Sequence, residues 1–391
     1  MAVPIYEPDI FSRAAIEDPY PHYRAIRDLG PVVLLGAQNV LAVGRYDDVR
    51  TVLADAGTFR SGEGVGFNEF ANELIRGTTL ASDQPVHDHL RTVVAHRLTP
   101  RALRGERERI QQLAEQVVVK ATEREVIDGV ADLAQAMPMS VVPEFLGFPE
   151  DCRDRLLEWA GGAIEALGPP SERTPAAGQL AGELGRYAEQ LVLTRGLAPG
   201  SLGEDLLTSA DTGKITVEQC PALLLDYFGP SLETTISALG SALALFSQHP
   251  DQWALLREDP SLVGGAFNEV VRLESPLRTF TRVTSGPTVL DGTPVPGGAR
   301  VAVLYASANR DERRWDDPEK FDILRDNADH LGLGYGVHAC AGQGLARLEF
   351  AAVITALAAR VARIEPVGEP VRVVNSLLRA YRSLPLRLVA G

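Results

Sequence analysis

The sequence predicts a mainly α-helical protein with a small β region. Apolar residues recur at helical spacing through most of the chain, whereas only short runs alternate as strands do. The segment 216–249 is the longest helical pattern and is apolar on most sides. A helix that is apolar all round is buried, so we expect this segment to cross the core. No linker separates two self-contained patterns, so residues 1–391 are expected to form one domain, with 1–17 as an N-terminal extension.

Proline and glycine mark the ends of the predicted elements. Pro19 and Pro85 each open a helix because proline suits the first helical turn, and Gly30 ends the first helix. Helices are predicted at 18–26, 46–53, 110–121, 139–148, 153–167, 179–193 and 216–249, with a further helix starting at 85. Strands are predicted at 32–35 and 40–43 as a hairpin, within 288–305, and at 371–374 and 385–389. Loops are predicted at 57–80, which is rich in glycine, and at 194–204.

Composition excludes several classes of protein. The formal net charge is −14, which argues against nucleic acid and against anionic membrane surfaces, since both are bound through Lys and Arg. No apolar stretch reaches the length of a membrane span. The first residues do not show the charged segment followed by an apolar one that is typical of a secretory signal. Cys152, Cys220 and Cys340 form an odd set without the spacing of a disulfide framework. We therefore expect a soluble protein of the reducing cytoplasm.

The most informative stretch is 332–349. Glycines at 332, 334 and 336 precede Cys340, and they allow a sharp bend and a close approach to a flat group. Leu345, Leu348 and Ala352 then recur at helical spacing, which predicts that the cysteine lies at a helix N-terminus. The macrodipole there favours a thiolate. A thiolate held by N–H donors suits an axial ligand of haem iron.

Other interpretations of this loop remain. A dinucleotide loop would need a third glycine where Val337 stands, and a preceding apolar strand. A zinc site could use His330, His338 and Cys340, but it would lack a fourth ligand at sensible spacing. A buried structural cysteine is the commoner fate of a lone Cys. On the loop alone, the pattern favours haem over these.

Pairs of polar residues on predicted helices add weaker signals. His87 and Arg91 lie four apart, so one face could hold carboxylates, although a solvated face is equally typical. In the central segment Pro230 lacks an N–H, and the Thr234 hydroxyl can bond the carbonyl four residues earlier. Glu269 and Arg272 lie three apart and favour an ion pair, as in many helices.

Together these stretches resemble the cytochrome P450 family. The cysteine loop matches Phe-Gly-x-Gly-x-His-x-Cys-x-Gly, with Leu333 in place of Phe. The resemblance implies the P450 fold, haem b as cofactor and Cys340 as the iron ligand. It also implies that the haem is contacted by His87, Arg91, Arg282 and His338. Glu269, Arg272 and Arg325 would maintain the fold behind the cysteine loop.

The resemblance further implies a monooxygenase. Glu233 and Thr234 match the acid–alcohol pair that supplies protons while dioxygen is activated, although Pro230 and Ser231 replace the usual small residues. The chain has no flavin, nicotinamide or iron–sulfur motif, so electrons must come from a partner. A ferredoxin and its reductase are therefore implied.

Closer similarity is to bacterial P450s that O-demethylate or hydroxylate para-substituted benzoates. The implied substrate residues are Arg76, Thr79, Ile164, Leu167, Asp226, Leu277 and Phe280. The residues that would contact the substrate differ from those of that group, because Ile164 and Leu167 replace phenylalanines and Leu225-Asp226 replaces Arg-Ser. We expect a buried Asp226 to pair with Arg76, which would favour phenolic or neutral aromatics over benzoates. The alternative is that Asp226 only bonds within the loop.

The same motifs are compatible with two functions other than a dioxygen-dependent monooxygenase. A peroxide-driven haem-thiolate peroxygenase would tend to lack the Glu233–Thr234 pair, and peroxide-supported against ferredoxin-supported turnover separates the two. A haem-binding sensor would lack turnover altogether. The expectation is thus a P450 that uses dioxygen to hydroxylate or O-demethylate a small para-substituted aromatic.

Overall fold

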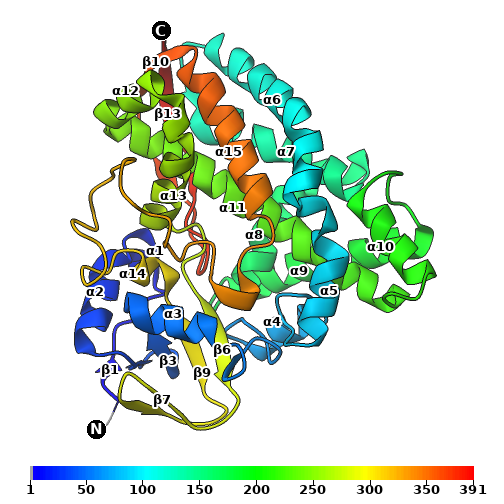
Figure 1. The fold of residues 1–391 in the computed structure, drawn as a ribbon, viewed down its shortest axis with the longest axis vertical. Helices are drawn as coiled ribbons and strands as arrows, with labels where there is room; N and C mark the ends of the chain where they lie inside the picture. Colours follow the sequence, from blue (N-terminus) through cyan, green and yellow to red (C-terminus); the bar gives the residue numbers. More distant parts are fainter. Residues whose placement is uncertain (1–2) are drawn as a thin grey trace.

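The computed structural model describes residues 3–391 (Figure 1). Its helices are α1 (Arg13–Glu17), α2 (Tyr20–Leu29), α3 (Tyr46–Ala54), α4 (Glu69–Leu74), α5 (Val86–Ala95), α6 (Pro100–Thr122), α7 (Ala136–Leu146), α8 (Leu156–Ala166), α9 (Thr174–Thr194), α10 (Leu202–Asp211), α11 (Cys220–Gln248), α12 (Pro250–Glu258), α13 (Val263–Glu274), α14 (Tyr305–Ala308) and α15 (Gln343–Ala358). Its strands are β1 (Ile5–Tyr6), β2 (Val33–Leu35), β3 (Val40–Val43), β4 (Phe59–Arg60), β5 (Ile127–Asp128), β6 (Phe280–Thr284), β7 (Thr288–Leu290), β8 (Thr293–Val295), β9 (Arg300–Val303), β10 (Val361–Pro366), β11 (Val371–Arg372), β12 (Tyr381–Ser383) and β13 (Pro385–Ala390). The mainly α prediction with a small β region is confirmed.

Helix α11 is the central element. It packs against α7, α8, α9, α13 and α15, and nearly every residue of its C-terminal half is buried. It is apolar around its circumference, so only a position enclosed by other helices buries it fully. The predicted segment 216–249 is divided, because Thr216 caps a short 3-10 turn before the α-helix begins. The largest apolar cluster of the core gathers around this helix.

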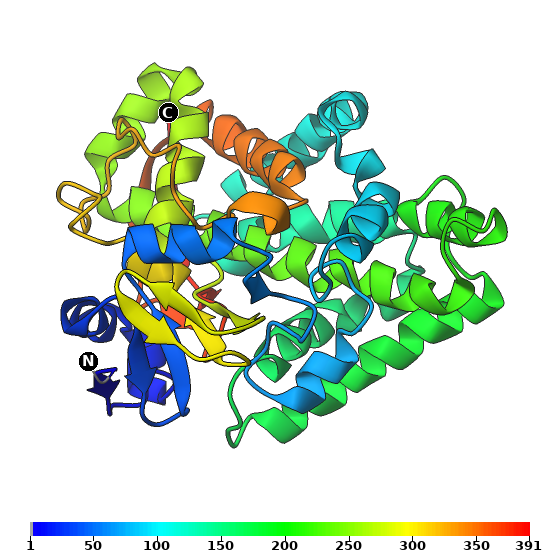
Figure 2. The same cartoon turned by 60° about the horizontal axis from the view of Figure 1, so that its bottom comes forward.

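The β region lies to one side of the helices (Figure 2). Its main sheet has the strand order β1-β2-β3-β9-β6-β4, and β2 and β3 form the predicted hairpin. Asn39 in the connecting turn adopts a φ of 53°. The short sheets β11-β12 and β7-β8 are separate from it, and the sheet β10-β13-β5 lies at the other end of the molecule, against α11, α12 and α15 (Figure 1). The hairpin β11–β12 matters for the site, since the segment between its strands reaches the central helix and α8.

Several expectations about loops need correction. The predicted loop 57–80 contains β4 and α4, and the predicted loop 194–204 ends in the first turn of α10. Helix α1 likewise lies in the predicted N-terminal extension, of which residues 1 and 2 are outside the described residues. In each case a polar side chain caps a short helix that has little apolar periodicity. Ser12, Asn68 and Ser201 accept a backbone N–H of the first turn. Within residues 3–391, no helix is long and apolar enough to cross a membrane.

Candidate active site

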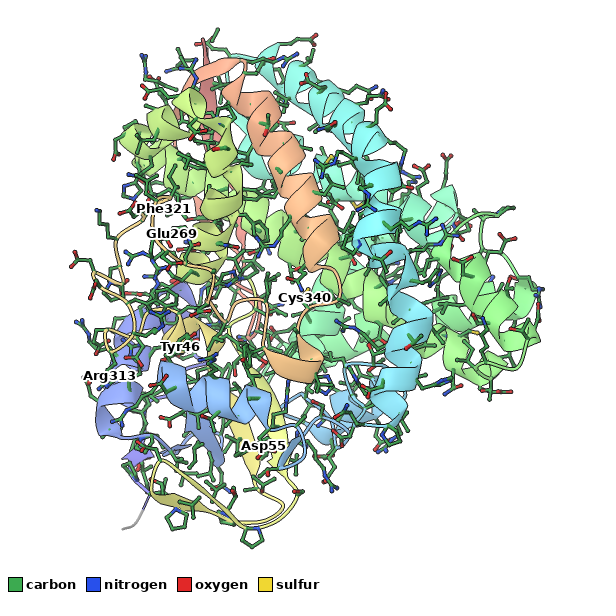
Figure 3. All side chains as sticks on the ribbon, in the orientation of Figure 1. Tyr46, Asp55, Glu269, Arg313, Phe321 and Cys340 are labelled. Atoms are coloured by element: carbon green, nitrogen blue, oxygen red, sulfur yellow. The ribbon has the colours of Figure 1, made fainter. Side chains whose placement is uncertain are left out.

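The loop before α15 presents Cys340 at the start of that helix (Figure 3). Gly334 and Gly336 have φ values of 70° and 71°, which side chains rarely adopt. A Cβ on Gly336 would also lie 2.7 Å from the carbonyl oxygen of Leu53 on α3. The loop closes on itself because the Cys340 N–H donates to the Leu333 carbonyl at 2.8 Å. Glycine is therefore required where the loop bends.

Cys340 precedes Gly342, the N-terminal cap of α15, as the sequence predicted, but the expectation that its thiolate is favoured needs correction. Burial raises the pKa of the thiol, while the N–H groups of Gly342 and Gln343 and the charge of Arg91 oppose this rise. Burial dominates because those donors stabilise the thiolate only in part. The free side chain is thus a thiol, and binding a metal cation is what would deprotonate it.

Donor groups with few acidic partners surround this loop. The rings of His87 and His338 lie 4.4 Å apart, and Arg91 donates to the Ala339 carbonyl at 2.6 Å. Burial, together with the charges of Arg282, His87 and Arg91, lowers the pKa of His338 to about 3. His87 contacts Asp88 through Nδ1 at 2.9 Å, yet its buried Nε2 has no hydrogen-bond partner.

This donor set fits haem b. Cys340 is partly exposed, the unpartnered Nε2 of His87 belongs to a ring that contacts His338 of the same loop, and guanidinium and imidazole groups suit the two carboxylates of that cofactor. The zinc alternative has no support in the described part of the chain, where no group of three or more His, Cys, Asp or Glu side chains could hold a metal ion. His330 instead accepts the Gly332 N–H at 3.2 Å and shapes the loop.

Glu233 and Thr234 lie near the middle of α11. The Thr234 hydroxyl donates to the Pro230 carbonyl at 2.6 Å, which confirms the predicted contact. Glu233 forms no ion pair or side-chain hydrogen bond within residues 3–391, and burial raises the pKa of its carboxyl group to about 7. Its Oε1 lies 3.6 Å from the position of a Cβ on Gly161 in α8. A carboxyl group with this pKa can both give and take a proton near neutral pH.

An apolar wall is assembled from distant segments. Ile164 of α8 and Leu167, which follows its last residue, pack in one cluster with Leu277 and Phe280, as a shared contact with substrate would require. Leu377 and Leu378 are fully buried in the same cluster, and Leu378 pairs with Leu277 across an isolated bridge. Sequence reasoning missed these two leucines. No local pattern marks them, because they lie in an irregular segment that only the fold brings to α8.

The expected pair of Asp226 with Arg76 is wrong. Arg76 is 67% exposed and bonds Glu73, with Nε–Oε2 and Nη2–Oε1 distances of 2.9 and 2.5 Å. Asp226 instead accepts the N–H groups of Thr79 at 2.6 Å and Leu80 at 3.4 Å, so the alternative of bonding within the loop holds. Glu73 is three residues from Arg76, so the two side chains are already neighbours. The ion pair therefore needs no other segment to be held in place. Burial raises the pKa of Asp226 to about 6, although these N–H donors oppose it.

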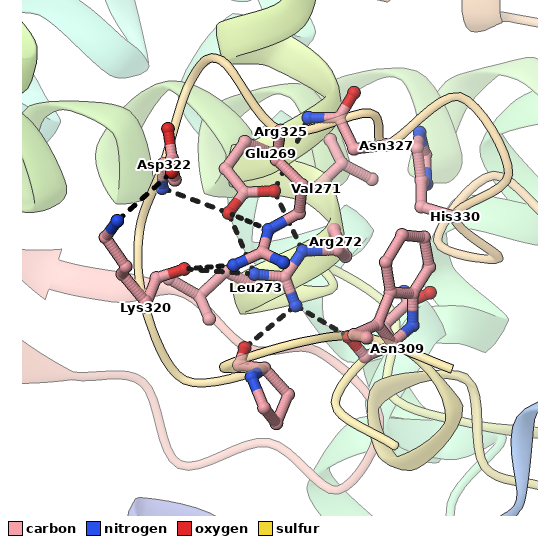
Figure 4. A network of polar contacts seen from close by, with 12 residues as sticks. Glu269, Val271, Arg272, Leu273, Asn309, Lys320, Asp322, Arg325, Asn327 and His330 are labelled. Atoms are coloured by element: carbon pink, nitrogen blue, oxygen red, sulfur yellow. Dashed lines mark hydrogen bonds and ion pairs between the residues drawn. The ribbon is translucent and has the colours of Figure 1, made fainter. Parts of the chain in front are cut away.

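The predicted ion pair behind the cysteine loop is present (Figure 4). Arg272 donates to both oxygens of Glu269 at 2.8 Å, and Arg325 reaches Glu269 at 3.2 Å. Asn309 connects this network to the loop, because its backbone carbonyl accepts from Arg272 and its Oδ1 accepts the Leu331 N–H at 2.7 Å. Sequence reasoning missed this connection.

Comparison with known proteins gives the family. Cytochrome p450 CYP199A2 of Rhodopseudomonas palustris is 39% identical over 97% of this chain and 93% of its own length. The chain belongs to the cytochrome P450 family. A family profile described as Cytochrome P450 matches residues 261–360. The Cytochrome P450 monooxygenase PikC of Streptomyces venezuelae is 33% identical over 96% of this chain and 92% of its own length.

Solved P450 structures show the same fold. P450BioI, in complex with an acyl carrier protein ligated to hexadec-9Z-enoic acid, has a TM-score of 0.87 at 25% identity and covers 95% of this chain and 99% of its own. Cytochrome P450 CREJ, in complex with (4-ethylphenyl) dihydrogen phosphate, has a TM-score of 0.86 at 27% identity and covers 95% of this chain and 98% of its own. This protein is therefore a P450 monooxygenase, an oxidoreductase that uses haem b, dioxygen and electrons from redox partner proteins.

Proposed function

We propose that this P450 hydroxylates or O-demethylates a small para-substituted aromatic compound, with electrons delivered by a ferredoxin and its reductase. The observation that carries the proposal is the apolar cluster of Ile164, Leu167, Leu277 and Phe280, whose size and aromatic member suit a benzene ring. The match to CYP199A2 over nearly the whole chain supports it. So does the likeness to CREJ, whose bound compound is a para-substituted phenyl ester.

The residues around the cysteine loop would hold the cofactor. Cys340 would bind the iron, and His87, Arg91, Arg282 and His338 would bind the two carboxylates. The unpartnered Nε2 of His87 supports this assignment, because a buried donor without a partner is costly. When bound, haem b supplies dioxygen activation and oxygen transfer.

Glu233 and Thr234 would move the protons. The Thr234 hydroxyl is oriented by the Pro230 carbonyl, so its oxygen lone pairs stay free to accept from water or substrate. Glu233 has a pKa of about 7 because it is buried, so it can release a proton and regain one from solvent within a catalytic cycle. Neither residue is held by an ion pair within residues 3–391, which leaves the Glu233 side chain free to change rotamer.

The polar end of the substrate is proposed to be neutral. Arg76 forms its ion pair on the surface, so it offers no charge to a benzoate unless the contact with Glu73 breaks. The carboxylate of Asp226 faces the segment after α4, where its oxygens accept the Thr79 and Leu80 N–H groups. A phenolic hydroxyl can be accommodated beside Thr79 and Asp226, whereas a carboxylate would meet a like charge.

Paired titrations test this proposal. We expect 4-methoxyphenol to shift the haem Soret band at concentrations at least tenfold below those needed for 4-methoxybenzoate. Asp226→Ser should narrow that difference, and Arg76→Gln should leave it unchanged because Arg76 is paired on the surface. Tight binding of the benzoate by the wild type, with no response to the phenol, would show that the neutral-substrate proposal is wrong. Product analysis with each bound compound then separates hydroxylation from O-demethylation.

A further inference from the structure

A cationic cleft lies away from the residues assigned to haem. It has a volume of about 380 Å³ and is lined by α1, the connection between α8 and α9, and the β11–β12 hairpin. Arg13, Arg173, Arg372 and Arg382 line it, together with a single carboxylate, Glu172. Three of these four arginines have carboxylate partners outside the lining, which are Glu17, Glu165 and Glu274. The surface of the cleft is nevertheless dominated by guanidinium groups, in a chain whose net charge is −14.

The ion pairs already present neutralise this lining only in part. Arg382 and Glu172 make no ion pair within residues 3–391. Arg13 pairs with Glu17, but both side chains are more than half exposed and such pairs contribute little. Arg372 forms an ion pair with Glu274 at 2.9 Å, and Arg173 forms one with Glu165 at 2.8 Å. Within residues 3–391, Arg382 therefore keeps its full charge for a ligand, and Arg13 is held only by an exposed pair.

The layer behind the cleft is also short of negative charge. Glu274 is shared by Arg310, Arg372 and Arg379, of which Arg310 also pairs with Glu319. Although burial opposes ionisation, these three arginines lower the pKa of Glu274 to about 2, so it is fully charged and still outnumbered. Arg278 is 1% exposed, and its Nε and Nη1 lack hydrogen-bond partners. The interior thus adds to the positive potential instead of cancelling it.

We propose that this cleft binds a small multivalent oxyanion, with phosphate or carboxylate groups as the recognised chemistry. Guanidinium groups present planar pairs of donors that match both kinds of anion. Arg372 is pre-oriented for this task, because its guanidinium stacks over the Tyr381 ring with the carbon 3.7 Å from the ring centroid. Arg382 and Arg13 approach from two other segments, so that one anion can bridge α1 and the hairpin.

The cleft is joined to the apolar wall through Arg173. Arg173 donates to Glu165 of α8 at 2.8 Å and to the Ser376 hydroxyl at 3.0 Å, and Glu165 also accepts the Ser376 hydroxyl at 2.9 Å. Ser376 immediately precedes Leu377 and Leu378 of the wall. An anion beside Arg173 would therefore hold the α8–α9 connection against the hairpin. We infer that occupancy tightens substrate binding, a step that rests on the proposed function above.

Thermal unfolding of the holoenzyme tests the site without substrate. Inorganic phosphate and citrate are titrated separately while sodium chloride keeps the ionic strength constant, since general screening then stays fixed. A specific site gives a saturable rise in Tm, as for any ligand that binds only the native state. The double variant Arg13→Gln/Arg382→Gln should raise the apparent Kd at least tenfold. Arg363→Gln, an exposed arginine on β10, is the matched control and should bind as the wild type does.

The outcomes are distinct. A saturable response that the double variant loses supports the site, and the tighter of the two anions identifies its natural ligand as a phosphate or a carboxylate compound. A response that is linear in concentration, or equal in all three proteins, overturns the proposal. The coupling is read separately, as the Kd of 4-methoxyphenol with and without the anion. An unchanged Kd in the wild type overturns the coupling, while absence of any Soret shift concerns only the proposed substrate.

Discussion

Burial determines the protonation of several single residues in this P450. Glu233 on α11 and Glu349 on α15 both have raised carboxyl pKa values, about 7 and about 8, and in both burial is the main cause. They differ in position. Glu233 is adjacent to Thr234 and partly exposed, whereas Glu349 is 1% exposed with its Oε2 unpartnered. The same physical effect would therefore serve the proposed proton transfer at Glu233, whereas at Glu349 it lowers the stability of the fold.

Thr234→Ala should uncouple the reaction. Haem content and substrate binding are expected to stay near those of the wild type, because the hydroxyl contacts only the Pro230 carbonyl of its own helix. Product formation per electron should fall by roughly a hundredfold, as is typical when a proton-transfer group is lost, and the electrons should appear as hydrogen peroxide. Thr235→Ala, on the buried neighbour, is the control. Unchanged coupling in Thr234→Ala would contradict the proposed role.

Glu349→Gln should stabilise the protein, and more so at high pH. The folded-state pKa of about 8 lies above the ordinary value of 4.5, so between these values the native state holds a proton that the unfolded chain has released. The free energy of unfolding of the wild type must therefore fall as pH rises through this window. Glutamine removes that dependence. The difference between variant and wild type should grow by a few kcal/mol from pH 5 to pH 8, measured by urea unfolding.

The control for this measurement is Glu258→Gln, since Glu258 is exposed at the end of α12. Its unfolding free energy should track that of the wild type at both pH values. A Glu349→Gln variant whose advantage is the same at pH 5 and pH 8 would show that the carboxyl group is not protonated by burial.

At the scale of elements, the cysteine loop depends on segments far from it in the sequence. Helix α13 contributes Glu269 and Arg272, and the turn after α14 contributes Asn309, which is fully buried. Asn309 bonds the Leu331 N–H at the start of the loop and the Ser275 hydroxyl at the end of α13. The position of the thiol is thus set by a helix end and a turn that the side chain of Asn309 joins.

Asn309→Ala should weaken cysteine ligation. The Leu331 N–H would lose its partner in a buried place, at a cost of about 1–3 kcal/mol. We expect the reduced carbon monoxide complex to convert from the thiolate-ligated absorption band to the inactive one at a lower temperature than in the wild type. Asn375→Ala removes comparable buried bonds, to the Leu377 and Leu378 N–H groups, without touching the loop. If both variants behave alike, Asn309 has only a general structural effect.

At the scale of the whole molecule, charge is distributed unevenly. The chain carries a net charge of −14, yet Arg101, Arg104 and Arg107 are exposed along one face of α6 and make no ion pair within residues 3–391. The N-terminal part of α6 adjoins the first turn of α15, just after Cys340, since a Cβ on Gly344 would lie 2.7 Å from the Leu103 side chain. An acidic electron-transfer protein would be steered to this face.

The triple variant Arg101→Gln/Arg104→Gln/Arg107→Gln should therefore slow reduction by a ferredoxin. We expect a loss of about tenfold in the second-order rate constant at low ionic strength, with a smaller salt dependence than in the wild type. Reduction by dithionite should be unaffected, and Arg363→Gln serves as the surface control. Equal rates for the triple variant and the wild type would place the docking face elsewhere.

Local chemistry explains what the sequence predicted well. The bend of the glycine loop, the Thr234–Pro230 contact and the Glu269–Arg272 pair all depend on residues within one or two helical turns, so spacing alone indicates them. The mainly α fold and the central helix follow from apolar periodicity in the same way. Short capped helices such as α4 escaped prediction, because a single polar cap leaves almost no pattern.

Only the tertiary structure determines which residues the polar and apolar side chains of the candidate site contact. Arg76 could have paired with Asp226 or with Glu73, and the choice depended on where the 57–80 segment lies against α11. Leu377 and Leu378 of the wall, the Asn309 bridge and the arginine-lined cleft each join segments separated by many residues. Such contacts leave no trace in local spacing, because the free energy that holds them comes from packing that the chain completes only when it is folded.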